Sequence, residues 1–288
     1  MIYILEKIRI ILEMIKFSHT LFALPFAFMG AILSARGIPS LDKILWIIVA
    51  MVGARSAAMF LNRLIDWRID VLNPRTKDRA IPKGLVTPVQ AVIFIIVSFV
   101  IFFFAAYMLN ELCFKLAPIA TGVLILYSYT KRFTWLSHFV LGIALSMSPI
   151  GAWIAITGKF ELPAFILGIA VVFWLSGFDI LYALQDIEFD KKMGLYSIPR
   201  FLGIKKSLWV SRGFHFLMVI FLLSLYPVIG LGKFYLIGII AASVLLIYEH
   251  SLIREDDLSK INIAFFNANA YISLCIFIFT LIDAVIVK

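Results

Sequence analysis

The sequence predicts an all-α integral membrane protein, and its composition and hydropathy pattern lead to this prediction. Of 288 residues, 63% are hydrophobic and only 15% are charged, whereas a soluble domain carries roughly a quarter charged residues. Apolar runs long enough to cross a bilayer recur along the whole chain. Little length is left for a soluble part, so we expect residues 1–288 to form one intramembrane domain.

The first stretch of the chain, residues 1–16, differs from the apolar runs that follow. Ile4, Ile8, Ile11 and Ile15 recur at helical spacing among charged residues. No small-residue cleavage site follows, which argues against a signal peptide. We expect an amphipathic helix that lies in the membrane interface.

Nine transmembrane helices are expected, separated by turn signals such as Gly37-Ile38-Pro39 and Gly230-Leu231-Gly232. Their expected ranges are 19–35, 43–65, 88–109, 112–130, 136–157, 163–186, 208–228, 233–252 and 264–286.

The distribution of basic residues predicts how the chain is oriented. If the N-terminus is cytoplasmic, most of the 26 lysines and arginines fall in cytoplasmic segments, as the positive-inside rule requires. We therefore expect an inner (cell) membrane protein with its C-terminus outside. The net charge of +9 follows from these loops, so no nucleic-acid partner is expected.

A dense polar block, residues 62–84, follows the second expected span. Asn62, Asp66 and Asp70 occur at i, i+4 and i+8, which places them on one face of a helix. Arg75 and Arg79 follow at once. Carboxylates beside a basic loop suit a Mg²⁺-bridged diphosphate. Taken alone, however, the block is equally typical of a solvated loop between membrane helices.

A second acidic block follows the sixth expected span and contains Asp179, Tyr182, Asp186 and Asp190. Its last two aspartates repeat the spacing of Asp66 and Asp70. Four expected spans separate the two blocks, so both reach the same membrane face. This pattern predicts two parallel four-helix repeats plus one helix around a central cavity. Two facing acidic clusters repel each other and need cations.

Further polar residues lie in or at the ends of apolar segments. Tyr127 and Lys131 share a helix face at the same membrane face as the two acidic blocks. A tyrosine at the membrane interface and a lysine that only follows the positive-inside rule would give the same pattern. Arg55 lies within a span, where it anchors a polar substrate group or pairs with a buried partner. The histidines lack metal spacing, and we interpret them as structural or interfacial: His19, His138, His215 and His250. Glu249 is interpreted as solvated.

Together these motifs resemble the UbiA-type superfamily of intramembrane aromatic prenyltransferases. The family pattern is NxxxDxxxD, an Arg-rich loop, YxxxK and DxxYxxxDxxxD, and this chain matches it in order and spacing over nearly its whole length. Residues 15–26 are similar to the 4-hydroxybenzoate polyprenyltransferase branch. The resemblance implies nine helices around one cavity with a lateral opening to lipid.

The resemblance also implies a reaction and residue roles. A polyprenyl diphosphate ionises, and its allylic cation attacks 4-hydroxybenzoate ortho to the hydroxyl, in ubiquinone-type quinone biosynthesis. Two Mg²⁺ ions would be held by Asp66, Asp70, Asp179, Asp186 and Asp190. The implied catalytic residues are Asp66, Asp70, Asp179, Asp186, Tyr127 and Lys131, and the implied substrate-binding residues are Arg55, Asn62, Arg75, Arg79, Tyr182 and Lys191.

Other functions remain open at this point. A dihydroxynaphthoate of the menaquinone route is an alternative acceptor. A cation- or proton-coupled transporter is an alternative of a different class, but it would prefer acidic residues near the bilayer midplane. An alcohol-phosphate transferase would need a DGxxAR-type block, which the sequence lacks. No obligate protein partner is evident.

Overall fold

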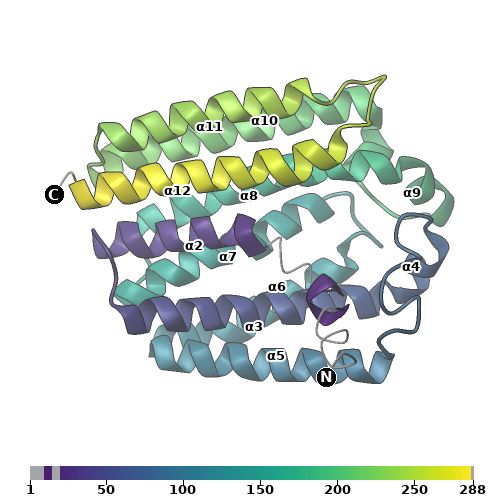
Figure 1. Cartoon of the computed structure of the whole chain (residues 1–288), viewed down its shortest axis with the longest axis horizontal. Coiled ribbons are helices and arrows are strands. Elements are labelled where there is room, and N and C mark those ends of the chain that lie inside the picture. The colour runs from purple at the N-terminus through teal and green to yellow at the C-terminus, as the bar shows by residue number, and fades with distance from the viewer. Residues whose placement is uncertain (1–9, 15–19, 287–288) are drawn as a thin grey trace.

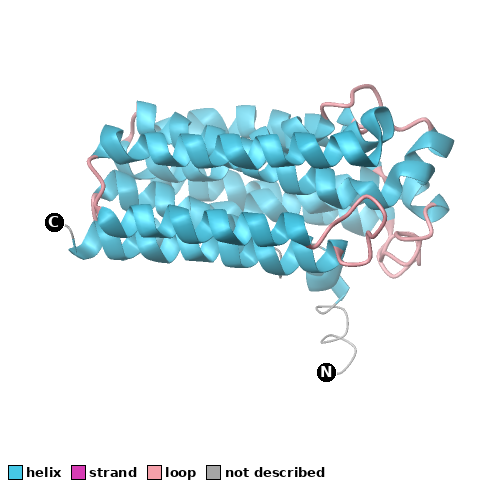
Figure 2. Cartoon of the chain, turned by 90° about the horizontal axis from the view of Figure 1, so that it is seen from above, coloured by secondary structure: helices cyan, strands magenta, loops and turns pink. Residues whose placement is uncertain are grey.

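The computed structural model describes residues 10–14 and 20–286 of the chain, and their regular elements are all helices (Figure 2). Of the amphipathic helix expected over residues 1–16, only residues 10–14 are described, and they are helical. The remainder of that expected helix lies outside the described residues. Within residues 10–14, Met14 belongs to the same buried apolar cluster as Phe60 of the second expected span.

The long helices run roughly parallel to one axis, and the short helices α4 and α9 lie together at one end of the bundle (Figure 1). The elements are α2 (Thr20–Ala35), α3 (Leu41–Ile65), α4 (Trp67–Leu72), α5 (Pro88–Leu109), α6 (Glu111–Thr130), α7 (Ser137–Thr157), α8 (Leu162–Ala183), η2 (Leu184–Asp186), α9 (Ile187–Met193), α10 (Ile198–Ile229), α11 (Lys233–Ser251), η3 (Ile263–Ala268) and α12 (Asn269–Ile286).

Eight helical segments of the described chain are long and apolar enough to cross a membrane. The protein is therefore a multi-pass membrane protein. The first of the nine expected spans corresponds to α2, which has 16 residues, fewer than the roughly 20 that a spanning helix needs. The expected number of nine thus remains a prediction.

Helix ends follow signals in the sequence. Thr87 and Gln90 form a reciprocal capping box at the start of α5, with Pro88 in its first turn. Asn110 separates α5 from α6, and its side chain accepts a hydrogen bond from the N–H of Cys113. At the far end of the bundle, Asp283 accepts hydrogen bonds from two N–H groups at the start of α11. These caps fix where the chain turns back into the bundle.

Close helix contacts place α8 at the centre of the core. A Cβ atom at Gly142 of α7 would lie 2.6 Å from the carbonyl oxygen of Val172 on α8, so only glycine permits this approach. Trp174 of α8 is fully buried in the same core as Leu222 of α10. Since α7, α8 and α10 are held together, their ends at the α4–α9 side of the bundle are also fixed relative to one another.

A buried polar network joins α8, α11 and α12. Asn269 accepts a hydrogen bond of 2.8 Å from the indole N–H of Trp174 and donates one of 2.7 Å to Glu249. Asn269 also donates to the carbonyls of Ala264 and Phe265, within the π-helical turn η3. Glu249 is 0% exposed, so its interpretation as a solvated residue was wrong. Through these contacts Asn269 joins the π-helical turn to the core network of α8 and α11.

Candidate functional site

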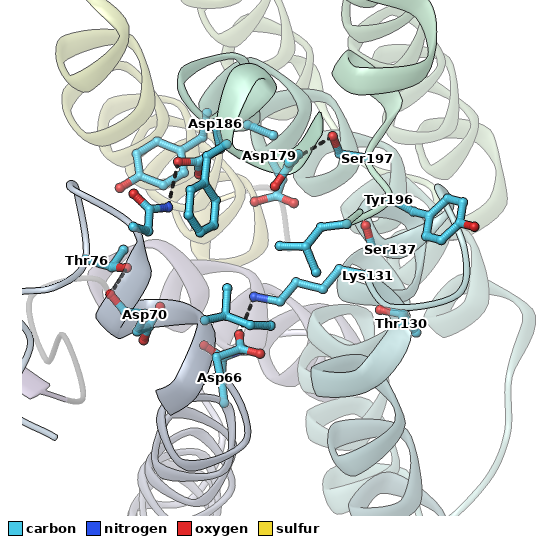
Figure 3. Close-up of a pocket in the computed structure, with 18 of the residues that line it drawn as sticks. Asp66, Asp70, Thr76, Thr130, Lys131, Ser137, Asp179, Asp186, Tyr196 and Ser197 are labelled. Atoms are coloured by element: carbon cyan, nitrogen blue, oxygen red, sulfur yellow. Dashed lines mark hydrogen bonds and ion pairs between the residues drawn. The ribbon is translucent and has the colours of Figure 1, made fainter. Parts of the chain in front are cut away.

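A polar cavity of about 180 Å³ lies beside α4 and α9 (Figure 3). These two helices lie at one end of the bundle (Figure 1). Its wall contains both acidic blocks, with Asp66 and Asp70 on one side and Asp179 and Asp186 on the other (Figure 3). The predicted residues on this wall are Asn62, Asp66, Asp70, Arg75, Arg79, Tyr127, Lys131, Asp179, Tyr182, Asp186 and Asp190. The structure therefore gathers three motifs that lie far apart in the sequence.

The first acidic cluster lies at the junction of α3 and α4. The helix is interrupted at Asp66, yet the amide of Asp66 still donates to the carbonyl of Asn62 and that of Asp70 to Asp66, at 2.9 and 2.8 Å. The expected i, i+4, i+8 alignment is preserved across the break for this reason. Asp66 and Asp70 are only 1% and 3% exposed. Buried carboxylates of this kind need partners.

Basic side chains supply those partners. Lys131 Nζ lies 2.5 Å from Asp66 Oδ2, and Arg132 Nη2 lies 3.0 Å from Asp66 Oδ1. The amide of Asn62 donates to Asp66 Oδ2 at 3.0 Å. Arg79 donates to both oxygens of Asp70 at 2.7 Å. These contacts neutralise the two carboxylates and fix their positions at the cavity wall.

The second acidic cluster is held from α7, the 73–79 loop and the start of α10. Asp179 Oδ2 lies 2.6 Å from His138 Nδ1. Asp186 accepts hydrogen bonds from Asn73 at 3.2 Å and from Arg75. Asp190 Oδ2 accepts a hydrogen bond of 2.8 Å from Ser197. Each carboxylate is therefore anchored by a different element.

Arg75 connects the two blocks across the cavity. Its guanidinium makes a two-point contact with Asp186, at 3.0 and 2.5 Å, and donates to the Tyr182 hydroxyl at 3.0 Å. Burial alone would lower the pKa of Arg75, but the hydrogen bond and charge of Asp186 outweigh burial and raise that pKa. Arg75 thus stays cationic where an anionic group would bind.

Two predicted residues lie elsewhere. Lys191 is exposed and pairs with Glu188 at 2.8 Å, outside the residues that line the cavity. Arg55 lies in the middle of α3 and is also absent from the cavity wall. The roles assigned to these two residues from the sequence stay predictions.

The sequence reasoning missed residues that the structure places at the site. Arg132 pairs with Asp66, Asn73 contacts Asp186 and Ser197 contacts Asp190. His138 lines the cavity and contacts Asp179, so its interpretation as a purely structural or interfacial histidine was incomplete. The adjacency of Arg132 to Lys131 was an available signal, whereas nothing in the spacing of His138 connects it with Asp179.

The donor set fits hard divalent cations. Carboxylate oxygens at a water-accessible cavity are the ligands that Mg²⁺ prefers, especially where it also contacts phosphate. Within residues 10–14 and 20–286, no three His, Cys, Asp or Glu residues are arranged to hold a metal ion. Asp66, Asp70 and Asp186 are paired with basic side chains instead. The same residues can hold a metal–diphosphate group if those basic side chains exchange the carboxylates for phosphate oxygens.

Residues 23–273 match the model of the UbiA prenyltransferase family. The chain is similar to the 4-hydroxybenzoate octaprenyltransferase of Vibrio atlanticus, with 31% identity over 85% of this chain and 86% of the relative. Among solved structures, a UbiA homologue from Aeropyrum pernix in its apo form is 31% identical, has a TM-score of 0.84 and covers 92% of this chain and 98% of its own.

A second solved structure shares the fold at lower identity. The UbiA homologue from Archaeoglobus fulgidus bound to GPP and Mg²⁺ is 21% identical, with a TM-score of 0.71 over 94% of this chain and 98% of its own. The match extends over nearly the full length of both chains, so the helical architecture belongs to a shared fold.

Proposed function

The chain belongs to the UbiA prenyltransferase family and is an aromatic prenyltransferase, and from this premise we propose that it transfers a polyprenyl group from polyprenyl diphosphate to 4-hydroxybenzoate, ortho to the hydroxyl, in ubiquinone-type quinone biosynthesis. The observation that carries the proposal is the pairing of two aspartate clusters with three basic side chains at one cavity. The similarity to the 4-hydroxybenzoate octaprenyltransferase of Vibrio atlanticus supports 4-hydroxybenzoate as the acceptor.

The carboxylates of both clusters would hold two Mg²⁺ ions. Asp66 and Asp70 would serve on one side, and Asp179, Asp186 and Asp190 on the other. Bound there, Mg²⁺ supplies positive charge that stabilises the leaving diphosphate. Two observations support this: the proposed ligand atoms are all carboxylate oxygens, and the homologue of Archaeoglobus fulgidus is bound to the same ion together with GPP.

The basic side chains would change partners when substrate binds. Arg75, Arg79 and Lys131 line the cavity, and each neutralises an aspartate in the present structure. A diphosphate offers these cations stronger and better matched acceptors, particularly for the planar arginine fork. Their charge then falls on the oxygens that become more negative as the C1–O bond breaks, which lowers the barrier to ionisation.

Aromatic rings beside the diphosphate site would protect the allylic cation. Tyr182 lines the cavity and stacks on Phe265 of η3, with ring centroids 4.1 Å apart. Tyr127 lines the same cavity from α6. Ring faces attract a cation, and an apolar wall excludes the water that would otherwise capture it. After attack, the ring proton would leave to Asp179 or to the diphosphate itself.

We also propose that the cavity opens to the cytoplasm, with the N-terminus inside and the C-terminus outside an inner (cell) membrane. The concentration of basic residues in the segments at this end supports that orientation. Transporters of repeat architecture bind their ions near the bilayer midplane. The carboxylates here gather instead at and just beyond the ends of α3 and α8 that lie at the cavity, with Asp179 in the last turns of α8, which disfavours a transporter.

The acceptor is tested by incubating membranes that contain the protein with radiolabelled polyprenyl diphosphate and Mg²⁺. Parallel reactions contain 4-hydroxybenzoate or a dihydroxynaphthoate. We expect label in the 4-hydroxybenzoate product, with NMR of that product placing the new bond ortho to the hydroxyl, and no product with EDTA. Transfer to the dihydroxynaphthoate alone would replace the proposed acceptor, and ion uptake by proteoliposomes without prenylation would overturn the enzyme mechanism.

A further inference from the structure

Three helices meet at the imidazole ring of His138, which belongs to the first turn of α7 and is 4% exposed. Its Nδ1 lies 2.6 Å from Asp179 Oδ2 on α8. Its Nε2 lies 3.4 Å from the backbone nitrogen of Ile198, the first residue of α10. The hydroxyl of Ser176 on α8 donates to the backbone carbonyl of His138 at 3.2 Å. The ring is therefore held on both its nitrogens and at its backbone.

These two ring contacts define the tautomer. The backbone N–H of Ile198 can only donate, so Nε2 of His138 must accept with its lone pair. The ring proton then resides on Nδ1 and is donated to Asp179. A hydrogen bond at one imidazole nitrogen commonly sets the role of the other in this way. His138 thus acts as a neutral hydrogen-bond donor to the carboxylate.

The start of α10 fixes the second acidic cluster at two points. The first N–H groups of a helix have no partner within the helix, and His138 accepts that of Ile198. Ser197 caps the same end by accepting from the amide of Arg200, and its hydroxyl donates to Asp190 Oδ2. Asp179 and Asp190 are therefore both positioned against the N-terminal end of α10, through His138 and Ser197 respectively.

The contact with His138 also decides which oxygen of Asp179 is available. Oδ2 accepts from the ring, and among the described residues no hydrogen-bond donor engages Oδ1. Asp179 nevertheless lines the cavity. One oxygen is thereby anchored in the protein and the other is left for a ligand. Hydrogen bonds to a metal-binding carboxylate from outside the metal's own ligands typically change metal affinity or activity by 10- to 100-fold.

We propose that His138 is a positioning residue: as the Nδ1–H tautomer, anchored by the Ile198 amide, it holds Asp179 so that Oδ1 faces the metal–diphosphate site. The metal part of this statement rests on the proposed function. The tautomer does not, so it is tested in metal-free protein without substrate.

Two substitutions separate the two contacts of the ring. The side-chain amide in His138→Asn occupies the place of Nδ1 and can still donate to Asp179, but it cannot reach Ile198. The amide in His138→Gln extends to the place of Nε2 and can accept from Ile198, but it does not donate to Asp179. His250→Asn is the matched control, since His250 bonds to His215 and lies outside the cavity. Thermal unfolding in detergent reports whether each variant folds.

The first readout is the ¹⁵N spectrum of metal-free protein labelled at its four histidines. His138→Asn assigns the signal of His138 by removing it. We expect the shifts of a neutral ring protonated at Nδ1. The second readout is binding of Mn²⁺, measured by electron paramagnetic resonance as loss of the free-ion signal, and the third is the kcat and KM of prenyl transfer.

We expect Mn²⁺ affinity and kcat to be retained in variants that keep a hydrogen-bond donor to Asp179 and to fall in the variant that loses it. His138→Asn and His250→Asn remain within about threefold of the unsubstituted protein, whereas His138→Gln loses about tenfold or more in both quantities. The melting temperature should depend on the contact with the Ile198 N–H, so His138→Gln should be more stable than His138→Asn. A ring protonated at Nε2, or a His138→Gln variant that binds Mn²⁺ as well as His138→Asn, would overturn the proposal.

If neither His138 variant folds, single substitutions of the other three histidines assign the His138 signal by elimination, and the tautomer of the unsubstituted protein decides alone. If that protein shows the Nδ1–H tautomer and binds Mn²⁺ but does not prenylate 4-hydroxybenzoate, the proposed function fails while the role of His138 stands. The two proposals are therefore separable.

Discussion

Arg75 and Asp186 form a two-point ion pair, with Arg75 Nη2 2.5 Å from Asp186 Oδ2 and Arg75 Nε 3.0 Å from Asp186 Oδ1. The pair joins the loop after the first acidic block to the second acidic block. Neither residue is near the other in sequence, so the contact depends on the whole bundle. It places a permanent cation beside the carboxylate that would receive a metal ion.

Replacing Arg75 should therefore impair catalysis more than folding. We expect Arg75→Ala to lower kcat by about 100-fold, since removal of one donor to a developing negative charge typically costs about 10²–10³. Arg75→Lys should recover only part of this loss, because an ammonium cannot make the two-point contact. Steady-state kinetics with polyprenyl diphosphate in purified, lipid-reconstituted protein measures the effect.

The control is Arg68→Ala, an exposed arginine near the cavity that does not line it. Equal losses in the two variants would show that general positive charge, rather than the contact with Asp186, is what matters.

Loss of either aspartate cluster should abolish transfer. Asp66→Asn and Asp186→Asn each remove a charged oxygen ligand while conserving shape, so excess Mg²⁺ is not expected to restore activity. EDTA should inhibit the unsubstituted protein, and added Mg²⁺ should restore it. Glu188→Gln, an exposed acid outside the cavity wall, is the control and should behave like the parent. Substantial activity in either aspartate variant would argue against a shared metal site.

The two lysines implied by the family resemblance should differ. Lys131 contacts Asp66 at the cavity, whereas Lys191 is exposed and pairs with Glu188. We expect Lys131→Ala to raise KM for polyprenyl diphosphate and lower kcat by about tenfold or more, and Lys191→Ala to change either by less than about twofold. Kinetics in both variants decide this, and a large effect at Lys191 would favour the sequence-based expectation over its place in the structure.

The buried network at Asn269 should contribute to stability. Asn269→Ala leaves the Trp174 N–H and a Glu249 oxygen without their partner, and an unsatisfied buried polar group costs about 1–3 kcal/mol. Thermal unfolding in detergent should show a clear decrease in melting temperature. Glu249→Gln retains an oxygen that accepts from Asn269 and should be much milder. An unchanged melting temperature for Asn269→Ala would mean that water or a side-chain rearrangement satisfies these groups.

Local patterns predicted much of this molecule. Apolar runs indicated the helical class and most helix positions. The i, i+4 spacing grouped Asp66 with Asp70 and Tyr127 with Lys131, and all four line one cavity. The four-span separation correctly placed Asp186 on the same side of the bundle as Asp66. The agreement arises because these features depend on helix period and membrane crossing, which the sequence encodes directly.

Contacts between residues of different helices and loops were harder to predict from the sequence. His138, Asn73 and Ser197 reach the second cluster from three different elements, and no periodicity links them to it. Glu249 was interpreted as solvated because it lies near a helix end, but it is fully buried and bonded to Asn269 of α12. Arg55 and Lys191 satisfied a motif or a charge argument yet lie away from the cavity wall. Such details depend on how helices pack against one another rather than on each helix alone.

The central claim is that both aspartate clusters form one metal–diphosphate site. It is tested most directly by Mg²⁺-dependent binding of a non-reactive prenyl thiodiphosphate, measured by calorimetry for the parent, Asp66→Asn, Asp186→Asn and the double variant. One shared site predicts that either substitution eliminates most of the Mg²⁺-dependent affinity and that the double variant is little worse than either single one. Two independent and additive losses, or full binding in either single variant, would contradict it.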